Sequence, residues 1–259
     1  MNPIHSHTIL DCLLARRFGV EYQPLVGTAD GEIRCYEALA RFVDAGGGLM
    51  PPDIVFEALH DNPLLLLHAE REMKLLQLQE APANGLLFVN LDPDSYAAGA
   101  GPDGENIFLP IFRSQRNRLV VEVIENLHLQ DVILSRQLIA DLCEAGIKVA
   151  IDDVSSSRGL VSYASLMDAA FVKFDRSWLT GELGARRRTI LTWALAQAAD
   201  LGLTTVLEGV ETAEDLALAR QMGFDLVQGF LFSERFVRRG CLPRGARQGA
   251  APTRSAVPL

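Results

Sequence analysis

The sequence predicts an α/β protein whose eight strands close into a (β/α)8 barrel of the TIM type with an atypical first strand. Its 259 residues match the roughly 250 that such barrels need. From about residue 86 onward, short aliphatic runs alternate with longer segments of helical period, which is the pattern of a parallel sheet with crossover helices. No second compositional regime interrupts that pattern, so one large domain is expected.

The first two predicted strands, 21–26 and 32–42, flank the turn-like sequence Thr28-Ala29-Asp30-Gly31, so we expect an antiparallel hairpin to join them. Six further strand candidates follow at 85–91, 118–124, 147–152, 169–175, 203–209 and 224–230. Each is nearly continuously apolar, as strands covered on both faces are. Eight strands that begin with a hairpin favour the closed barrel, and an open doubly wound sheet is the alternative.

Helices are predicted between the strands. Three of them, 131–145, 186–201 and 213–222, end near a glycine, a residue that often terminates helices. A helical stretch is also expected from 52 to 80. We divide the chain into a lead-in helix at 1–17, a barrel domain at 18–240 and a tail at 241–259. The tail lacks periodicity and is rich in Pro, Gly, Ala and Arg, so it is expected to be disordered.

Charge and composition disfavour several functions. The chain has 24 Lys and Arg against 33 Asp and Glu, a net charge of −9, which disfavours binding to a nucleic-acid polymer. Its apolar runs are far shorter than the ~20 residues of a membrane span, and its N-terminus does not read as a secretory signal. The four cysteines lack metal-ligand spacing and are expected to be reduced and mostly buried. These features predict a cytoplasmic protein.

Polar and acidic residues stand within or just after the strand candidates, near the carboxyl ends where a barrel places its active site. They are Glu37, Asn90, Glu122, Asp152, Asp153, Lys173, Glu208 and Gln228. A single acid at a strand end is more often a helix cap or a surface charge. Several charged side chains inside apolar runs are costly to bury unless they pair or bind a metal ion. We therefore expect them to converge on one cation-binding site.

The expected ligands are all oxygen atoms, which favours Mg²⁺ or Mn²⁺ over zinc. The five histidines precede the first helix or lie on predicted helices, where a hydrogen-bonded or solvated role is expected. Adjacent Asp152 and Asp153 could hold two ions a few ångströms apart. Lys173 is either a structural ion-pair partner or a group that holds an attacking water. Such a site suits hydrolysis of a phosphodiester.

A series of short motifs runs through the chain in a fixed order. They are Gln23-Pro24-Leu25, Glu37-Ala38-Leu39 with Arg41, Val89-Asn90-Leu91, Glu122-Val123-Ile124-Glu125, Asp152-Asp153, Lys173-Phe174-Asp175, Glu208-Gly209-Val210-Glu211 and Gln228-Gly229-Phe230. In this combination the sequence resembles the EAL-domain family of cyclic di-GMP phosphodiesterases over about residues 18 to 236. The resemblance implies a (β/α)8 barrel that cleaves cyclic di-GMP to the linear dinucleotide pGpG with Mg²⁺ or Mn²⁺.

The resemblance also assigns roles to individual residues. It implies that Glu37, Asn90, Glu122 and Asp152 bind one ion and that Asp152, Asp153 and Glu208 bind a second. Lys173 would hold the nucleophilic water and Glu208 is a candidate general base. The implied substrate contacts are Gln23, Leu39 and Arg41, with Gln228 ordering the site. Glu125 would brace the loop after the paired aspartates, and Asp175 and Glu211 are expected to support the same region. A homodimer is expected only from this resemblance, and a regulatory protein partner is a further candidate.

Three stretches depart from the family pattern. After Asp152-Asp153 the family reads roughly FGTGYSS, whereas this chain has Val154, Ser155, Ser156 and Ser157 followed by an arginine, a glycine and a leucine. The usual serine after Asn90-Leu91 is Asp92. The stretch 55–60 replaces a phenylalanine-isoleucine-proline run that ends in an acid.

Three functions follow from these observations. An active phosphodiesterase is favoured by the complete set of metal-ligand candidates. The altered loop favours instead a catalytically weak or inactive domain that acts as a cyclic di-GMP receptor or binds a protein. An unrelated metal-dependent barrel enzyme, such as an enolase-like lyase, is the third alternative.

Overall fold

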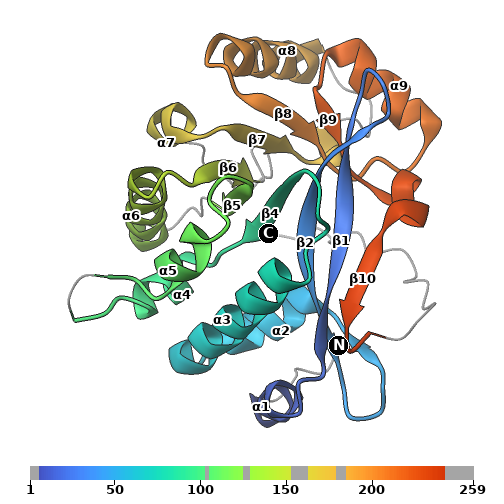
Figure 1. Cartoon of the computed structure of the whole chain (residues 1–259). Coiled ribbons are helices and arrows are strands. Elements are labelled where there is room, and N and C mark those ends of the chain that lie inside the picture. The colour runs from blue at the N-terminus through green and yellow to red at the C-terminus, as the bar shows by residue number, and fades with distance from the viewer. Residues whose placement is uncertain (1–5, 103–104, 125–128, 153–162, 179–184, 243–259) are drawn as a thin grey trace.

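The computed structural model describes residues 6–102, 105–124, 129–152, 163–178 and 185–242, and it forms an eight-stranded barrel (Figure 1). The barrel strands are β1 (Phe18–Gly27), β2 (Ile33–Val43), β4 (Leu86–Asn90), β5 (Leu119–Ile124), β6 (Lys148–Asp152), β7 (Phe171–Phe174), β8 (Thr204–Leu207) and β9 (Leu226–Val227). Strands β2 and β4 to β9 pair in parallel, while β1 is antiparallel to both β2 and β9 and so closes the barrel. The predicted barrel with an antiparallel first strand is confirmed.

Two short strands extend the sheet beyond the barrel and were not predicted. Strand β3 (Leu49–Met50) pairs with the end of β2. Strand β10 (Val237–Gly240) pairs with β1 from Gly19↔Gly240 to Tyr22↔Val237. Because β9 pairs with β1 only at Val26 and Gly27, the two late strands share one edge of β1. Figure 1 shows the red β10 beside the blue β1, so residues from opposite ends of the sequence become neighbours.

The helices cover the outside of the barrel. They are α1 (Ser6–Leu14), α2 (Pro52–Leu59), α3 (Pro63–Gln79), α4 (Pro93–Ala98), α5 (Phe108–Arg113), α6 (Leu129–Glu144), α7 (Tyr163–Asp168), α8 (Ala185–Asp200) and α9 (Ala213–Met222), with short 3-10 turns η1 (Arg176–Trp178) and η2 (Phe230–Arg235). The helical stretch expected from 52 to 80 is two helices rather than one. Pro63 cannot continue a helix from the residues before it, and Asn62 caps α3 by accepting a hydrogen bond from the Leu65 amide.

One residue from each barrel strand fills the interior. This inner layer consists of Leu25, Cys35, Phe88, Val120, Ala150, Phe171, Val206 and Leu226. Phe88 and Phe171 cross it edge to face, with ring centroids 4.9 Å apart. Since side chains on a strand alternate between its two faces, the next inward position on each strand lies two residues farther along. That next layer carries the polar residues of the candidate site.

The expected cysteine chemistry is borne out in part. All four cysteines are free thiols, but only Cys12 and Cys35 are buried, while Cys143 and Cys241 are exposed. Among the described residues, no helix combines the length and apolar composition that crossing a membrane requires. The expected disorder of the tail concerns residues 243–259, which lie outside the described part of the chain, and the division into 1–17, 18–240 and 241–259 stays a prediction.

Candidate active site

Eight polar side chains form a layer directly above the apolar interior, one from each barrel strand or the residue that follows it. They are Gln23, Glu37, Asn90, Glu122, Asp152, Lys173, Glu208 and Gln228. Each stands two positions from a residue of the apolar layer, toward the carboxyl ends of the parallel strands. Gln23 lies directly opposite Glu37, and Asn90 lies directly opposite Glu122. Other members are offset along their strands, since Glu122 lies beside Ala150 and Lys173 beside Val206. The structure therefore brings these eight predicted positions together.

Lys173 occupies the centre of this layer. Its Nζ lies 2.5 Å from Oε1 of Glu208 and 2.6 Å from Oε1 of Glu122. The same nitrogen is 3.5 Å from Oε2 of Glu37 and 3.7 Å from Oδ1 of Asp152. The Lys173 side chain is 1% exposed, whereas that of Glu208 is 24% exposed. One ammonium group thus faces four carboxylates, and the layer opens to solvent on the Glu208 side.

Three amide side chains complete the layer around Glu37. Asn90 donates from Nδ2 to Oε1 of Glu37 at 2.9 Å, and Gln228 donates from Nε2 to Oε2 at 2.6 Å. Gln228 Nε2 also lies 3.3 Å from Oε1 of Gln23. Asn90 and Gln228 therefore each hold one oxygen of Glu37, and the expected role of Gln228 in ordering the site stays a prediction.

The pKa values of the buried carboxylates shift in different directions. Burial and the neighbouring Glu37 raise the pKa of Glu122 well above its usual range. Burial, with Asp152 and Glu37, also raises the pKa of Glu208 to about 8 against the pull of Lys173. For Glu37, burial is outweighed by Lys173 and by hydrogen bonds, so its pKa is lowered. Burial would lower the pKa of Lys173, but the four carboxylates raise it, so this side chain stays charged.

The layer is suited to hold divalent cations. When all four carboxylates are ionised, one ammonium group leaves an excess of three negative charges. Both carboxylate oxygens of Glu122 are buried; Oε1 faces the Lys173 ammonium, and neither oxygen accepts a hydrogen bond of good geometry from the described residues. Buried carboxylate oxygens whose hydrogen-bonding capacity is not filled can act as ligand atoms for a hard cation. Glu37, Asn90, Glu122, Asp152 and Glu208 therefore fit a Mg²⁺ or Mn²⁺ site.

A second polar group lies at the rim, farther toward the mouth of the barrel. Glu21 on β1 is 2% exposed and accepts a hydrogen bond from Nη2 of Arg41 at 2.8 Å. It also accepts from Nε of Arg238 at 2.5 Å and from Nε2 of Gln23 at 3.1 Å. Leu39, directly opposite Glu21 on β2, is half-buried. The three expected substrate contacts, Gln23, Leu39 and Arg41, thus adjoin one buried carboxylate.

Of the remaining expected site residues, Asp175 and Glu211 are described and do not join the cluster. Asp153 and Glu125 lie outside the described residues, as does the altered loop 153–160. Asp175 follows β7 and accepts a hydrogen bond at Oδ1 from the Ser177 amide. Glu211 pairs with Arg176, whose Nη1 lies 2.5 Å from Oε2. The expected support of the loop by these residues stays a prediction.

Two of the three departures from the family pattern contact each other. His60, at the end of α2, lies 2.9 Å through Nε2 from Oδ2 of Asp92. Asp92 also caps α4, where its Oδ1 accepts from the amides of Asp94 and Ser95. Nδ1 of His60 lies 2.7 Å from the carbonyl oxygen of Phe56. Both ring nitrogens therefore face acceptors, which accounts for the raised pKa of His60 despite its partial burial.

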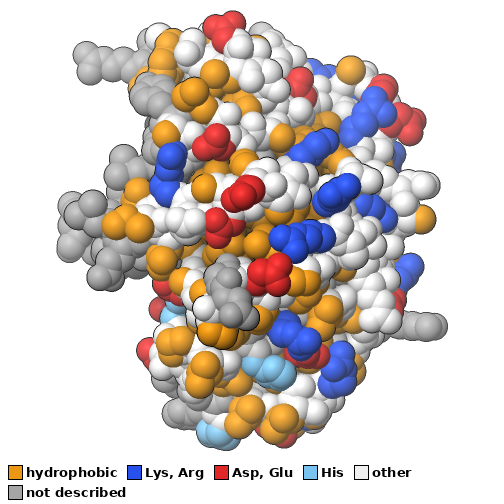
Figure 2. Space-filling view, turned by 60° about the vertical axis from the view of Figure 1, so that its left-hand side comes forward, with side chains coloured by type: hydrophobic (Ala, Val, Ile, Leu, Met, Phe, Trp, Pro, Cys, Tyr) orange, Lys and Arg blue, Asp and Glu red, His pale blue; other side chains and the backbone are white. Residues whose placement is uncertain are grey.

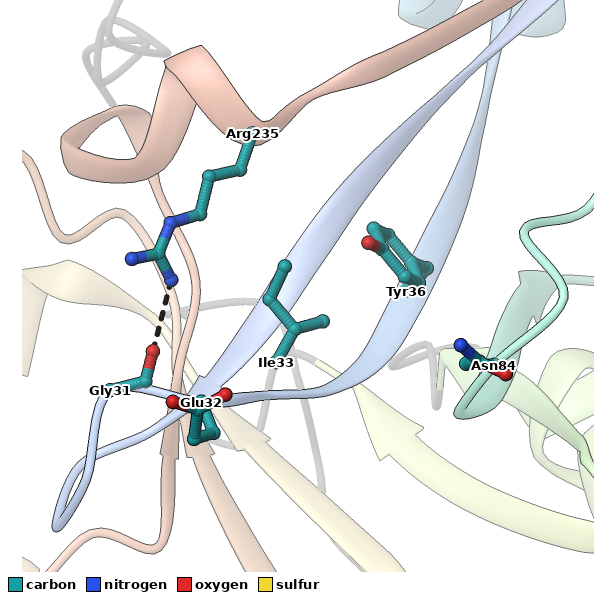
Figure 3. Close-up of a pocket in the computed structure, with 6 residues that line it drawn as sticks. All are labelled: Gly31, Glu32, Ile33, Tyr36, Asn84 and Arg235. Carbon is teal, nitrogen blue, oxygen red and sulfur yellow. Dashed lines mark hydrogen bonds between the residues drawn. The ribbon is translucent and has the colours of Figure 1, made fainter.

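A cavity of about 370 Å³ lies away from the polar layer, at the opposite end of β2 (Figure 3). It is lined by Gly31, Glu32, Ile33, Tyr36, Asn84 and Arg235. Figure 3 shows Arg235 reaching the tip of the β1–β2 hairpin, where its Nη1 donates to the Gly31 carbonyl oxygen. Because Ile33 begins β2 and Asn84 precedes β4, this cavity belongs to the amino-terminal face of the barrel.

Sequence reasoning missed Glu21 and Arg238. Glu21 could have been found, since it shares the inward face of β1 with Gln23 and Leu25 at a spacing of two residues. Arg238 carries no such signal, because β10 is short and lies in a stretch without clear periodicity.

Figure 2 shows Lys and Arg side chains gathered to one side of a group of Asp and Glu side chains. The net negative charge of the chain thus conceals local basic regions.

Comparisons with known proteins point to one family. The family model for the EAL domain matches residues 7–235. Cyclic di-GMP phosphodiesterase NbdA of Pseudomonas aeruginosa is 28% identical over 222 residues, which are 83% of this chain and 28% of NbdA. This chain thus spans little more than a quarter of that relative.

Two solved structures share the fold. The PaMucR phosphodiesterase in complex with c-di-GMP is 26% identical with a TM-score of 0.67, and the match covers 87% of this chain and 94% of that one. The manganese and cyclic di-GMP complex of BlrP1 from Klebsiella pneumoniae is 26% identical with a TM-score of 0.65, covering 87% of this chain and 56% of that one. With the family model matched over most of its length, the chain belongs to the EAL domain family.

Proposed function

We propose that this chain is a cyclic di-GMP phosphodiesterase that hydrolyses its substrate to pGpG by a two-metal mechanism with Mg²⁺ or Mn²⁺. The observation that carries the proposal is the convergence of four carboxylates on the buried ammonium of Lys173, with Asn90 hydrogen-bonded to one of them, Glu37. A protein that only bound a ligand would gain nothing from carboxylates that repel one another without a cation. The EAL family and the cyclic di-GMP complexes of its relatives support the same substrate.

Glu37, Asn90, Glu122 and Asp152 would hold one ion, and Asp152, Asp153 and Glu208 the second. When bound, the ions supply Lewis-acid polarisation of the scissile phosphate and lower the pKa of a bound water. Asn90 and Gln228 keep the Glu37 carboxylate oriented through their hydrogen bonds to its two oxygens.

Lys173 and Glu208 would serve the proton transfer. The two side chains approach to 2.5 Å through Nζ and Oε1, next to the solvent-open side of the layer. Lys173 would hold the attacking water, and Glu208 would accept its proton as the new oxygen–phosphorus bond forms. The bond from phosphorus to the departing ribose oxygen breaks, that oxygen takes up a proton, and one water has then been added to give the linear product.

Gln23, Leu39 and Arg41 would contact the dinucleotide, and Arg41 offers a guanidinium fork that suits a phosphate. Within this proposal residues 18–240 are the catalytic barrel. Assembly into a homodimer and control by a regulatory protein partner are proposed from the family resemblance.

Turnover of cyclic di-GMP tests the proposal. The purified chain with Mn²⁺ or Mg²⁺ should convert cyclic di-GMP to pGpG, which chromatography detects. Chelation of the metal should stop the reaction. Glu37→Gln should abolish product formation, whereas Glu57→Gln, a matched change outside the site, should not. Tight binding without any product would contradict the enzymatic proposal and identify a cyclic di-GMP receptor.

A further inference from the structure

Glu21 gathers basic side chains from two distant parts of the sequence. Arg238 lies directly opposite it across the β1–β10 pair, and Arg41 lies diagonally opposite across the β1–β2 pair. Both guanidinium groups donate to Glu21, Arg41 to Oε1 at 2.8 Å and Arg238 to Oε2 at 2.5 Å. Arg238 stands three residues beyond the last residue that the EAL family model matches.

This rim group is connected to the metal-binding layer through hydrogen bonds. Gln23 donates to Oε1 of Glu21 and lies 3.3 Å from Gln228, which donates to Oε2 of Glu37. Glu21 stands two residues from Gln23 on the same inward face of β1, a rise of about 7 Å along the strand. The rim group therefore lies one layer above the metal ligands, on the side from which substrate enters.

The charge of the rim group is suited to an anion. Two guanidinium groups and one carboxylate leave a net charge of one positive unit. The Arg238 side chain is 32% exposed, while those of Glu21 and Arg41 are 2% and 10% exposed. A guanidinium has five N–H donors and can serve two acceptors at once, so a bond to Glu21 is compatible with a phosphate contact.

We propose that Arg238 is a substrate-binding residue which, with Arg41, contacts the phosphodiester that is not cleaved, and that Glu21 positions both arginines. This inference rests on the proposed function, since a cyclic dinucleotide has two phosphodiesters and the metal ions would engage the scissile one. The second phosphate needs a cationic partner at the rim. Strand β10 supplies it from outside the matched part of the family.

The competing explanation is that the Glu21–Arg238 pair only fastens β10 to β1. In that case Arg238→Ala would lower the melting temperature and leave the affinity for cyclic di-GMP unchanged. Arg239 provides a matched control, because it is the adjacent arginine on β10, is exposed and faces away from Glu21. Arg238→Lys keeps the charge but loses the planar fork.

The test measures kcat and KM for cyclic di-GMP with Mn²⁺ in the whole chain, together with equilibrium dialysis of cyclic di-GMP in a chelator. Arg238→Ala should raise KM and the dissociation constant about ten-fold, equivalent to about 1.4 kcal/mol, and change kcat by less than about three-fold. Arg238→Lys should recover part of the affinity, and Arg239→Ala should match the parent.

The positioning role of Glu21 has its own readout. Glu21→Gln should raise KM, because the arginines lose their common charged acceptor, and should raise it less when Arg238 is already alanine. A KM at or below that of the parent would refute this role. Melting temperatures of all variants establish that each one is folded.

The outcomes separate the two proposals. Equal KM values for the parent, Arg238→Ala and Arg239→Ala would overturn the inference while leaving the phosphodiesterase intact. If the parent binds cyclic di-GMP without turnover, only the enzymatic proposal is refuted. The dissociation constants of the same variants, measured by dialysis, would still decide the role of Arg238. A parent that neither binds nor hydrolyses it would overturn both.

Discussion

Lys173 and Glu122 form a fully buried ion pair, in which Nζ lies 2.6 Å from Oε1 and the two side chains are 1% and 0% exposed. The pair does not balance its surroundings, because three further carboxylates lie within 3.7 Å of the same nitrogen. Without metal ions, the ionised site is therefore destabilised by repulsion among its carboxylates. The folded state should depend on metal and pH in ways that identify individual residues.

Glu122→Gln should stabilise the metal-free protein while it removes activity. The raised pKa of Glu122 shows that its charge is unfavourable in the folded state, and Lys173 keeps three other carboxylates as partners. If removing this charge raises the free energy of unfolding by about 1 kcal/mol, the melting temperature should rise by roughly 2–4 °C for a domain of this size. Hydrolysis should fall at least ~100-fold, since a proposed metal ligand loses its charge.

Thermal unfolding in a chelator and with Mn²⁺ checks this expectation. The parent should gain much more stability from Mn²⁺ than Glu122→Gln does. A variant that is less stable than the parent in the chelator would show that Glu122 contributes to folding rather than to metal binding.

The metal-free protein should lose stability as the pH rises from about 4.5 to about 8. Burial raises the pKa of Glu208 from 4.5 to about 8, so the folded state keeps a proton that the unfolded state has released. Stability then falls over that interval and levels off above it, by a few kcal/mol at most. Urea unfolding in a chelator at pH 5.5, 7 and 8.5 measures the slope.

Glu208→Gln provides the control for this pH dependence. The amide cannot titrate, so the free energy of unfolding should decline less with rising pH in the variant than in the parent. The remaining decline would come from Glu122. Mn²⁺ should stabilise the parent more at pH 8 than at pH 6, because its ligands must be deprotonated. Identical slopes for the parent and Glu208→Gln would exclude Glu208 as the titrating group.

The polar layer could be predicted because it follows the alternation of strand side chains. Phe88 and Asn90, or Phe171 and Lys173, are neighbours on one strand face, so a polar residue two positions after a core residue also faces inward. Sequence patterns fix such local relations well. The same patterns predicted the barrel, because each aliphatic run corresponds to a strand.

Relations between distant segments were not predictable in this way. Arg238 meets Glu21 only because β10 pairs beside β9 on one edge of β1. His60 meets Asp92 because the residue after α2 lies beside the N-cap of α4, and each residue alone reads as a surface position. The break at Pro63 is local, because proline favours the first turn of a helix and disrupts a helix interior.

The contact between His60 and Asp92 should stabilise the protein at acidic pH and lose its effect as the pH rises. The pKa of His60 is raised, so its contribution to stability is fully present below about pH 6.5, the usual pKa of histidine. The contribution disappears as the pH rises past the pKa that His60 has in the folded state. The His60 side chain is 43% exposed, which limits the effect to about 1 kcal/mol or less.

Asp92→Asn isolates this charge effect, because asparagine can still cap α4. The difference in free energy of unfolding between the parent and Asp92→Asn should be larger at pH 5.5 than at pH 8.5. A difference that is the same at both values would assign the role of Asp92 to capping alone.

Gly229→Ala should destabilise the barrel and disturb the site together. A Cβ atom at this position would lie 2.1 Å from the Val210 carbonyl oxygen and 2.4 Å from its nitrogen, so the backbone itself must move. Val210 and Gln228 are joined there by a backbone hydrogen bond, and Gln228 orients Glu37. Overpacking typically costs about 1–3 kcal/mol, and against fixed backbone atoms we expect the upper end of that range.

Gly223→Ala is the matched comparison for Gly229→Ala. Gly223 has a φ of +87° at the end of α9, but its Cβ would meet no atom within 4 Å. Its substitution should therefore carry only the left-handed backbone cost of about 1–2 kcal/mol and leave the Mn²⁺-induced stabilisation unchanged. Urea unfolding and Mn²⁺ titration of both variants test this difference. If Gly229→Ala kept the parent's response to Mn²⁺, the backbone contact with Val210 would have no part in holding Gln228 against Glu37.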